Sequence, residues 1–343
     1  MEIYELSADG GVKRISELPC GVRLVCAFGC FDGVHIGHQA LLSEAVRVAH
    51  DARSCVVDVG NTLEYAPAVW TFSEPVSKPW VISIKERLAL CGRFGIRYAL
   101  CQRFEDVRTL SPGEFIDVLV SEYSVRHGVC GGNFRFGYKG AGDPERLDSC
   151  IRGALGRFGH RGVSESGSVS VVADVCELGG IVSSTRIRGL LSEGEVESAG
   201  VLLGRPYSLL GIVLAGKQIG RTISRPTANL VYSPDQLIPK HGVYFTYCRV
   251  KGKLYRAVTN VGYRPTVNSD VGSVTCEAHI LDFSEAVYGE RAEIIFVHYH
   301  RAETAFASVE ALSEQITRDV TCASEFFNGI EQLETEKRLS GEK

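Results

Sequence analysis

The sequence has no hydrophobic run long enough to cross a membrane. Its longest apolar stretches, such as residues 207–216, fall well short of the roughly 18 residues that a membrane span needs. The N-terminus also lacks a cationic region followed by an apolar core, and Glu2 stands where a signal peptide would carry Lys or Arg. We therefore expect a cytoplasmic protein without a membrane partner.

Positive charge is not in excess either. The 37 Lys and Arg residues stand against 41 Asp and Glu residues, which gives a formal net charge of −4. Such a chain has no broad basic surface that would attract nucleic acid or anionic lipid. We expect no nucleic-acid partner, and any phosphate chemistry must depend on a few well-placed groups.

The twelve cysteines include no C-x-x-C pair. Zinc sites use closely paired ligands, and disulfide scaffolds are typical of short secreted chains. Several of these cysteines lie inside apolar runs, for example Cys26, Cys130 and Cys248, where a reduced cysteine behaves as a small hydrophobic residue. The sequence therefore predicts reduced thiols, which agrees with a cytoplasmic location.

The length of 343 residues, with 45% hydrophobic residues, predicts two domains, each with its own core. We place them at residues 1–195 and 196–335. In the first, strand-like and helix-like segments alternate, which favours a parallel α/β sheet. The expected strands are 22–28, 69–72, 98–101 and 127–130, and the expected helices are 35–49, 84–94, 115–119 and 185–191, with a loop at 162–170. A further helix is expected at 196–203, directly after the boundary.

After residue 207 the chain changes character. Short β-branched or aromatic runs are separated by turn-forming residues, which predicts an antiparallel barrel or sandwich. Val309, Leu312, Ile316 and Val320 then follow at helical spacing, so a C-terminal helix should close this half. The expected strands are 209–214, 243–250, 254–258, 274–281 and 292–299.

The first motif, at residues 29–38, reads GCFDGVHIGH and directly follows a predicted strand. Glycines there allow a sharp turn, and the free N–H groups of the next helix are a natural seat for phosphate. His35 and His38 share one face of that helix and could donate hydrogen bonds to a triphosphate. This segment resembles the H-x-G-H nucleotidyltransferases, a Rossmann-like family.

Two further segments narrow that resemblance. Residues 183–188 read SSTRIR at a predicted helix start, where hydroxyls, backbone amides and Arg188 suit phosphate. Residues 131–137 read GGNFRFG, which is similar to the G-x-[DN]-F-x-F-G segment of FMN adenylyltransferases. The resemblance implies that the first domain joins FMN and ATP to give FAD and pyrophosphate.

The second half resembles riboflavin kinase. Residues 226–229 read PTAN, residues 259–266 read TNVGYRPT, and residues 276–283 read CEAHILDF. The resemblance implies that Thr227 and Asn229 hold Mg²⁺ with the ATP phosphates. It also implies that Glu277 activates the ribityl hydroxyl of riboflavin, which agrees with the need of a primary hydroxyl for a nearby base. His279 and Asp282 are alternative bases.

Over nearly its whole length the chain is thus similar to the bifunctional bacterial riboflavin kinase/FMN adenylyltransferases. The expected partners are riboflavin, FMN, ATP and FAD. The expected catalytic residues are His35, His38, Arg188 and Glu277; the expected metal ligands are Thr227 and Asn229; and the expected nucleotide-binding or flavin-binding residues are Gly29, Phe31, Asp32, Gly33, Asn133, Ser183, Ser184, Thr185, Gly216, Lys217, Gly220, Arg221, Asn260 and Arg264.

Two departures from the family pattern leave alternatives open. Residues 71–76 read TFSEPV in place of T-F-D-P-H-P, and residues 223–229 read ISRPTAN in place of L-G-F-P-T-A-N. One alternative is therefore an enzyme that retains a single activity, with the other half acting as a binding module. Others are a flavin-sensing regulatory module and an adenylyltransferase for another cofactor, which would leave the P-T-A-N half unexplained.

Overall fold

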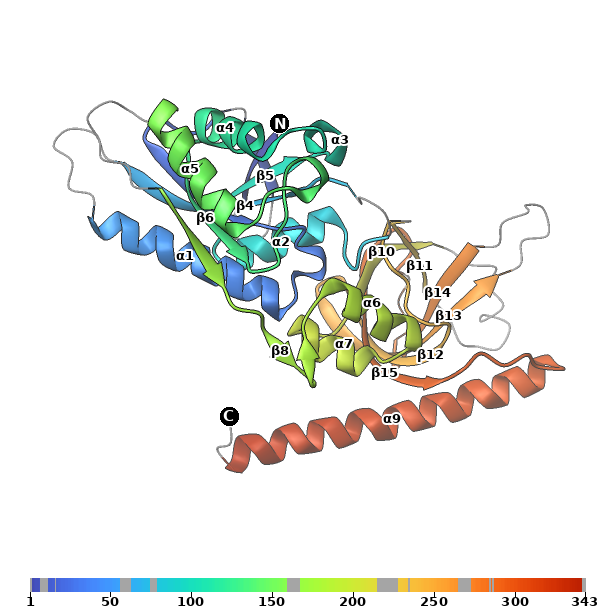
Figure 1. Cartoon of the computed structure of the whole chain (residues 1–343). Helices are drawn as coiled ribbons and strands as arrows, with labels where there is room; N and C mark the ends of the chain where they lie inside the picture. Colours follow the sequence, from blue (N-terminus) through green and yellow to red (C-terminus); the bar gives the residue numbers. More distant parts are fainter. Residues whose placement is uncertain are drawn as a thin grey trace. The chain divides into compact units, whose positions relative to one another are not determined.

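The computed structural model describes residues 2–6, 12–15, 17–55, 63–74, 79–158, 167–214, 228–233, 235–264, 273–283, 285 and 287–340. The chain separates into two compact units, Met1–Arg186 and Ile187–Lys343, each described here by itself (Figure 1). The boundary that we predict between residues 195 and 196 stays a prediction.

The first unit is built around a seven-stranded sheet in the order β2-β1-β5-β4-β3-β6-β7. Its strands are β1 (Glu2–Leu6), β2 (Val12–Ile15), β3 (Val22–Phe28), β4 (Glu64–Phe72), β5 (Tyr98–Gln102), β6 (Val125–Gly131) and β7 (Ser168–Val172). Its helices are α1 (Ile36–Cys55), α2 (Ile84–Arg93), α3 (Phe104–Val107), α4 (Pro112–Tyr123) and α5 (Pro144–Phe158), with the short helices η1 (Asp32–Val34) and η2 (Tyr138–Gly140). A two-stranded hairpin, β8 (Cys176–Glu177) and β9 (Gly180–Ile181), precedes α6 (Ser184–Glu193).

The expected parallel sheet has antiparallel pairs at one edge. Strands β3 to β7 pair in parallel, but β1 pairs antiparallel with both β2 and β5. The short connection between β1 and β2 makes an antiparallel pair, whereas a parallel pair needs a long crossover. The predicted loop at 162–170 is partly wrong, since β7 begins at Ser168. Helix α5 was not expected.

Helices cover both faces of this sheet (Figure 1). Leu24, Cys26 and Phe28 of β3 belong to one core cluster with α4 and α5. Val25 and Ala27 alternate with them and therefore point to the opposite face, where α1 runs along the central strands. Helices α2 and α4 begin with complete capping boxes, in which side chains of the first turn accept hydrogen bonds from the otherwise unpaired backbone N–H groups.

The second unit is a closed barrel in the order β10-β11-β14-β13-β12-β15, with every neighbouring pair antiparallel. This settles the alternative of barrel or sandwich in favour of the barrel. Its elements are α7 (Val196–Leu203), β10 (Ser208–Leu214), β11 (Ala228–Tyr232), β12 (Gly242–Val250), β13 (Lys253–Arg264), β14 (Ser273–Ile280), β15 (Arg291–Arg301) and α9 (Val309–Ser340).

Gly211 lies within strand β10, as the expected strand at 209–214 implies. A Cβ atom there would stand 2.2 Å from the carbonyl oxygen of Val231 on the neighbouring strand. The glycine therefore permits close approach of two strands, which is a packing role.

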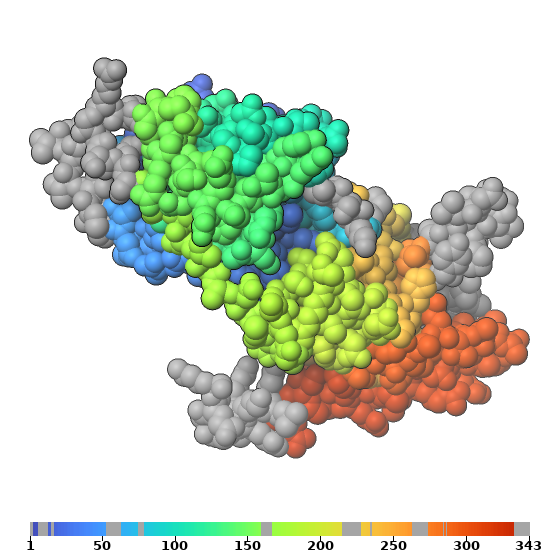
Figure 2. All heavy atoms as spheres, in the orientation of Figure 1, coloured from blue at the N-terminus to red at the C-terminus, as the bar shows by residue number. Residues whose placement is uncertain are grey.

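Helix α9 packs against the outside of the barrel, along one side of the second unit (red in Figure 2). Ala323 and Phe327 of the helix are fully buried against Val243, Phe245 and other barrel residues. The guanidinium of Arg301 binds both carboxylate oxygens of Asp319 at 2.9 and 2.6 Å. Among the described residues, no helix is long and apolar enough to cross a membrane.

Phe327→Ala should destabilise the second unit by about 3–5 kcal/mol, because it removes a buried aromatic ring and leaves a cavity. Both tryptophans, Trp70 and Trp80, lie in the first unit. In urea, far-UV circular dichroism should show an early transition, whereas the tryptophan fluorescence transition should stay where it is. Val309→Ala, at an exposed position of the same helix, serves as the control. A wild-type circular dichroism curve for Phe327→Ala would contradict this.

Candidate active sites

A tight turn after strand β3 forms the base of the first site. Phe31, Gly33 and Val34 all have positive φ, at 50°, 81° and 42°. This backbone is costly for Phe and Val, so the surrounding structure must hold it. The carboxylate of Asp32 contributes by accepting a hydrogen bond of 2.8 Å from the backbone N–H of Val81.

A buried arginine, which the sequence analysis missed, ties this turn to the sheet. The guanidinium of Arg87 donates to the carbonyl of Cys30 at 2.7 Å and to the hydroxyl of Thr71 at 3.2 Å. It lies 3.8 Å from the carboxylate of Asp32 and 3.4 Å above the centre of the Trp80 ring. Burial lowers the pKa of Arg87 to about 10, and the charge of Asp32 opposes that shift. In the sequence, the only sign that Arg87 is buried is its position next to Leu88 and Cys91 on the buried face of α2.

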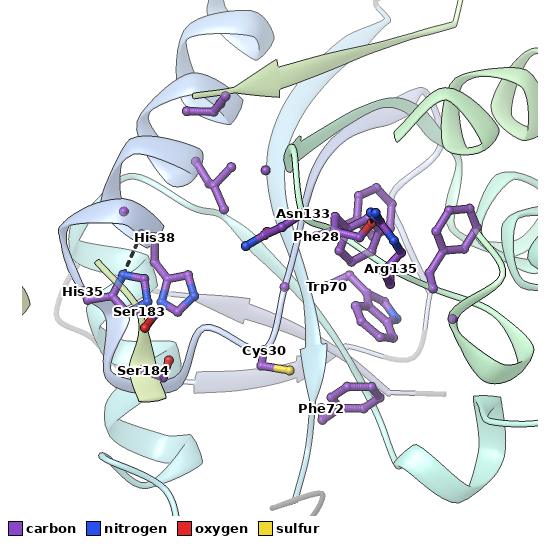
Figure 3. Close-up of a pocket in the computed structure, with 18 of the residues that line it drawn as sticks. Phe28, Cys30, His35, His38, Trp70, Phe72, Asn133, Arg135, Ser183 and Ser184 are labelled. Atoms are coloured by element: carbon purple, nitrogen blue, oxygen red, sulfur yellow. Dashed lines mark hydrogen bonds between the residues drawn. The ribbon is translucent and has the colours of Figure 1, made fainter. Parts of the chain in front are cut away.

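The two predicted histidines stack on each other at the start of α1, with ring centres 3.6 Å apart and planes 16° apart (Figure 3). The backbone N–H of His38 donates to Nδ1 of His35 at 3.2 Å, so the hydrogen of a neutral His35 ring is on Nε2. Burial, followed by the charges of His35 and Arg87, holds the pKa of His38 well below its ordinary value. His38 is therefore neutral at physiological pH.

Gly37 lies between the two histidines. A Cβ atom there would lie 3.2 Å from Nδ1 of His35. The glycine leaves room for the His35 ring next to the first turn of α1.

The three hydroxyl residues of the SSTRIR segment are brought to this turn. The hydroxyl of Ser183 accepts from the backbone N–H of Arg186 at 3.2 Å and so caps α6. The hydroxyl of Ser184 donates to the carbonyl of Asp32 at 2.9 Å, which joins the start of α6 to the turn. Arg188 lies further along α6 in the second unit, and its catalytic role stays a prediction.

A cavity of about 600 Å³ lies over the turn. His35, His38, Ser183 and Ser184 lie at one end of it, and Phe28, Trp70, Phe72 and Arg135 lie at the other, with Asn133 between them (Figure 3). Of the predicted residues of this half, those that line the cavity are Gly29, His35, His38, Asn133, Ser183, Ser184 and Thr185. The other three predicted residues, Phe31, Asp32 and Gly33, are buried in the turn itself and do not line the cavity.

The far end of the cavity is aromatic. The Trp70 ring meets Phe72 and Phe115 edge-on, with ring centres 4.9 and 5.1 Å apart. Phe134 and Phe136 stack with ring centres 5.6 Å apart. The last two belong to the GGNFRFG segment, from which the sequence analysis selected only Asn133. A flat aromatic ligand would find stacking partners here.

The second site is a row of polar side chains on the barrel. Register places Asn229 of β11 and Asn260 of β13 on either side of Glu277 of β14. Cys276 and Ala278 are buried in the barrel, so Glu277 and its two partners point outward. The three neighbours are thus cross-strand pairs close enough to act on one ligand.

Several predicted residues of this half lie outside the described residues: Gly216, Lys217, Gly220, Arg221 and Thr227. Arg264 ends strand β13. The described residues contain no group of three or more His, Cys, Asp or Glu residues that could hold a metal ion. Asn229 is the expected metal ligand that the structure describes.

Comparisons with known proteins cover both units. The FAD synthetase family model matches residues 20–186 and the riboflavin kinase model matches residues 203–327. A crystal structure described as a macrolide-efflux protein from Streptococcus pneumoniae has a TM-score of 0.75 and 28% identity, and covers 90% of this chain and 96% of its own.

Curated relatives are similar over nearly the full chain. The bifunctional riboflavin kinase/FMN adenylyltransferase of Pseudomonas fluorescens is 36% identical and covers 87% of this chain and 91% of its own. The enzyme of Listeria monocytogenes is 33% identical, over 90% of this chain and 94% of its own length. The enzyme of Escherichia coli K12 is 32% identical, over 92% of this chain and 96% of its own length. Since both domains match in the expected order, the chain belongs to the bifunctional riboflavin kinase/FMN adenylyltransferase family.

Proposed function

We propose that this enzyme, a riboflavin kinase and FMN adenylyltransferase, uses the cavity of the first unit for adenylyl transfer and the polar row of the barrel for phosphoryl transfer. The cavity carries the proposal. This cavity lies in the unit that matches FAD synthetase. One end, with His35, His38 and Ser183, suits phosphate groups, and the other end is aromatic, as a product made of a nucleotide and a flavin requires.

In adenylyl transfer, a phosphate oxygen of FMN attacks the α-phosphorus of ATP, and the bond to the β-phosphate oxygen breaks to release pyrophosphate. His35, whose Nδ1 accepts the backbone N–H of His38, donates from Nε2, and His38, whose Nδ1 is buried and has no hydrogen-bond partner among the described residues, offers a second polar edge. Hydrogen bonds to oxygens that gain charge in the transition state lower the barrier. The aromatic end holds the isoalloxazine ring.

In phosphoryl transfer, the primary ribityl hydroxyl of riboflavin attacks the γ-phosphorus of ATP, and ADP leaves. The carboxylate of Glu277 accepts the hydroxyl proton. Asn229 and Asn260 flank it and position phosphate or hydroxyl groups. His279 shares the outward face of β14 two residues further on and supports the strand without acting as the base.

The divalent cation that accompanies ATP is Mg²⁺ in this proposal, held by Thr227 and Asn229. The carboxamide oxygen of Asn229 is a hard donor beside Glu277, and so the described part of the donor set fits. When bound, the cation neutralises charge on the ATP phosphates. A cytoplasmic location is supported by eleven of the twelve cysteines, which are free thiols.

His38→Ala should slow the conversion of FMN to FAD by about 10²–10³-fold, since it removes a hydrogen-bonding group from the phosphate seat. FMN formation from riboflavin should continue. Both products are measured by chromatography of the flavins. His50→Ala, at an exposed position of the same helix, is the matched control and should behave as wild type. Rapid FAD formation by His38→Ala would contradict the assignment.

Glu277→Gln should have the opposite effect. Glutamine preserves the size of the side chain but cannot take a proton, and loss of a general base costs about 10²–10⁴-fold in rate. FMN formation should fall accordingly, whereas added FMN should still become FAD. Glu290→Gln, in an exposed turn of the same unit, is the control. If Glu277→Gln made FMN at the wild-type rate, another residue would be the base.

Phe134→Ala should raise the KM for FMN by about 2- to 13-fold, because an aromatic contact with the flavin is worth about 0.5–1.5 kcal/mol. The KM for ATP in adenylyl transfer should change little, and FMN formation should not change. Initial rates at varied FMN and ATP distinguish the two constants. Tyr138→Ala removes an exposed aromatic ring from the same unit and is the control. An equal rise in both KM values would argue against a flavin end.

A further inference from the structure

Glu303 lies beside the polar row of the barrel, although no motif drew attention to it. It follows strand β15 in the segment that leads to α9. Its carboxylate oxygen Oε1 accepts a hydrogen bond of 3.0 Å from the side-chain nitrogen of Asn260. Asn260 is the cross-strand partner of Glu277, so Glu303 reaches the proposed kinase site through one hydrogen bond.

Gly262 makes room for this carboxylate. A Cβ atom built at Gly262 would stand 1.9 Å from Oε1 of Glu303 and 2.6 Å from its Cδ. Residues 260 and 262 of β13 share the outward face, since side chains alternate along a strand. Gly262 is not in the left-handed region that requires glycine, so the reason for glycine in the TNVG segment is space for Glu303.

The chain before Glu303 is anchored firmly. Arg301, at the end of β15, binds the carboxylate of Asp319 on α9 with two hydrogen bonds, and Asp319 is only 2% exposed. Gln315 donates to the same carboxylate at 2.8 Å, and Arg301 also donates to the carbonyl of Ala302 at 3.0 Å. Glu303 is therefore only two residues from Arg301, which is fixed by its ion pair with the buried Asp319. This limits the positions that the Glu303 carboxylate can take.

We infer that Glu303 is a positioning residue for riboflavin phosphorylation and that it acts through Asn260. A carboxylate accepts hydrogen bonds only, so it selects the amide orientation in which the NH₂ group of Asn260 faces Glu303. The carboxamide oxygen then faces away from Glu303, where it is available to a ligand held beside Glu277. This inference rests on the proposed kinase site.

The test is a double-mutant cycle on the full-length enzyme. Glu303→Ala removes the acceptor, and Gly262→Ala displaces it, because the far end of a flexible, exposed side chain gives way more easily than the strand. Each change should lower the kcat of FMN formation by about tenfold or more. Because both act on one contact, the double variant should be no slower than Glu303→Ala alone.

Two further variants separate positioning from general damage. Glu303→Gln keeps an oxygen that accepts from Asn260 and should stay within about threefold of wild type. Glu314→Ala, at an exposed position of α9, should be unchanged. Conversion of added FMN to FAD and the thermal unfolding midpoint should be the same for all variants, which shows that losses in kcat are not losses of fold.

Three outcomes would overturn the inference: a wild-type kcat for Glu303→Ala, losses that multiply in the double variant, or a Glu303→Gln enzyme as slow as Glu303→Ala. Failure of the proposed site gives a different pattern, in which Glu277→Gln itself retains FMN formation. If Glu277→Gln is inactive and Glu303→Ala is fully active, the site stands and only the positioning role falls.

Discussion

The buried Arg87 guanidinium holds the first site together. One side chain on α2 binds the backbone at Cys30, the hydroxyl of Thr71 at the end of β4, and, at longer range, the carboxylate of Asp32. Burying a charge is costly unless it is paired and hydrogen-bonded, so these partners are what make the arrangement stable. The carboxylate of Asp32 in turn accepts from the backbone N–H of Val81, in the segment before α2, and its carbonyl accepts from Ser184 at the start of α6. The unusual backbone at Phe31 and Val34 is held among these contacts. Burial lowers the pKa of His38 most, and the charge of the same guanidinium lowers it further, which favours a neutral imidazole.

The second site depends on strand register. Asn229, Glu277 and Asn260 come from three strands that are distant in the sequence, and antiparallel pairing sets them in one row. A shift of one residue would turn Glu277 into the barrel and bring Cys276 out. The close approach of β10 and β11 at Gly211, and the helix α9 against the outer face, belong to the packing that keeps the barrel closed.

Much of the fold was predictable because its elements have strong periodic patterns. Strand β3 and helix α7 have the predicted bounds, and most other predicted elements are correct within a few residues at one end or both. The errors have physical causes. Strands β1 and β2 are short and half polar, and β7 alternates serine with valine, so none has the apolar run of a buried strand. Helix α5 does have an amphipathic pattern, with Leu147, Ile151, Ala154 and Leu155 buried on one face, and the sequence-based prediction overlooked it.

By itself, the sequence determined the two-domain plan, the family, and the residues of the short motifs, because contiguous residues such as those at 29–38 carry their geometry locally. Only the tertiary structure decided which residues that are far apart in the sequence contact one another. The contacts of Arg87 with Cys30, of Ser184 with Asp32, and of Glu303 with Asn260 span 57, 152 and 43 residues. It also gave a reason for two motif glycines: Gly37 and Gly262 leave room for His35 and Glu303, and no local pattern contains that information because the neighbouring atoms are set by packing.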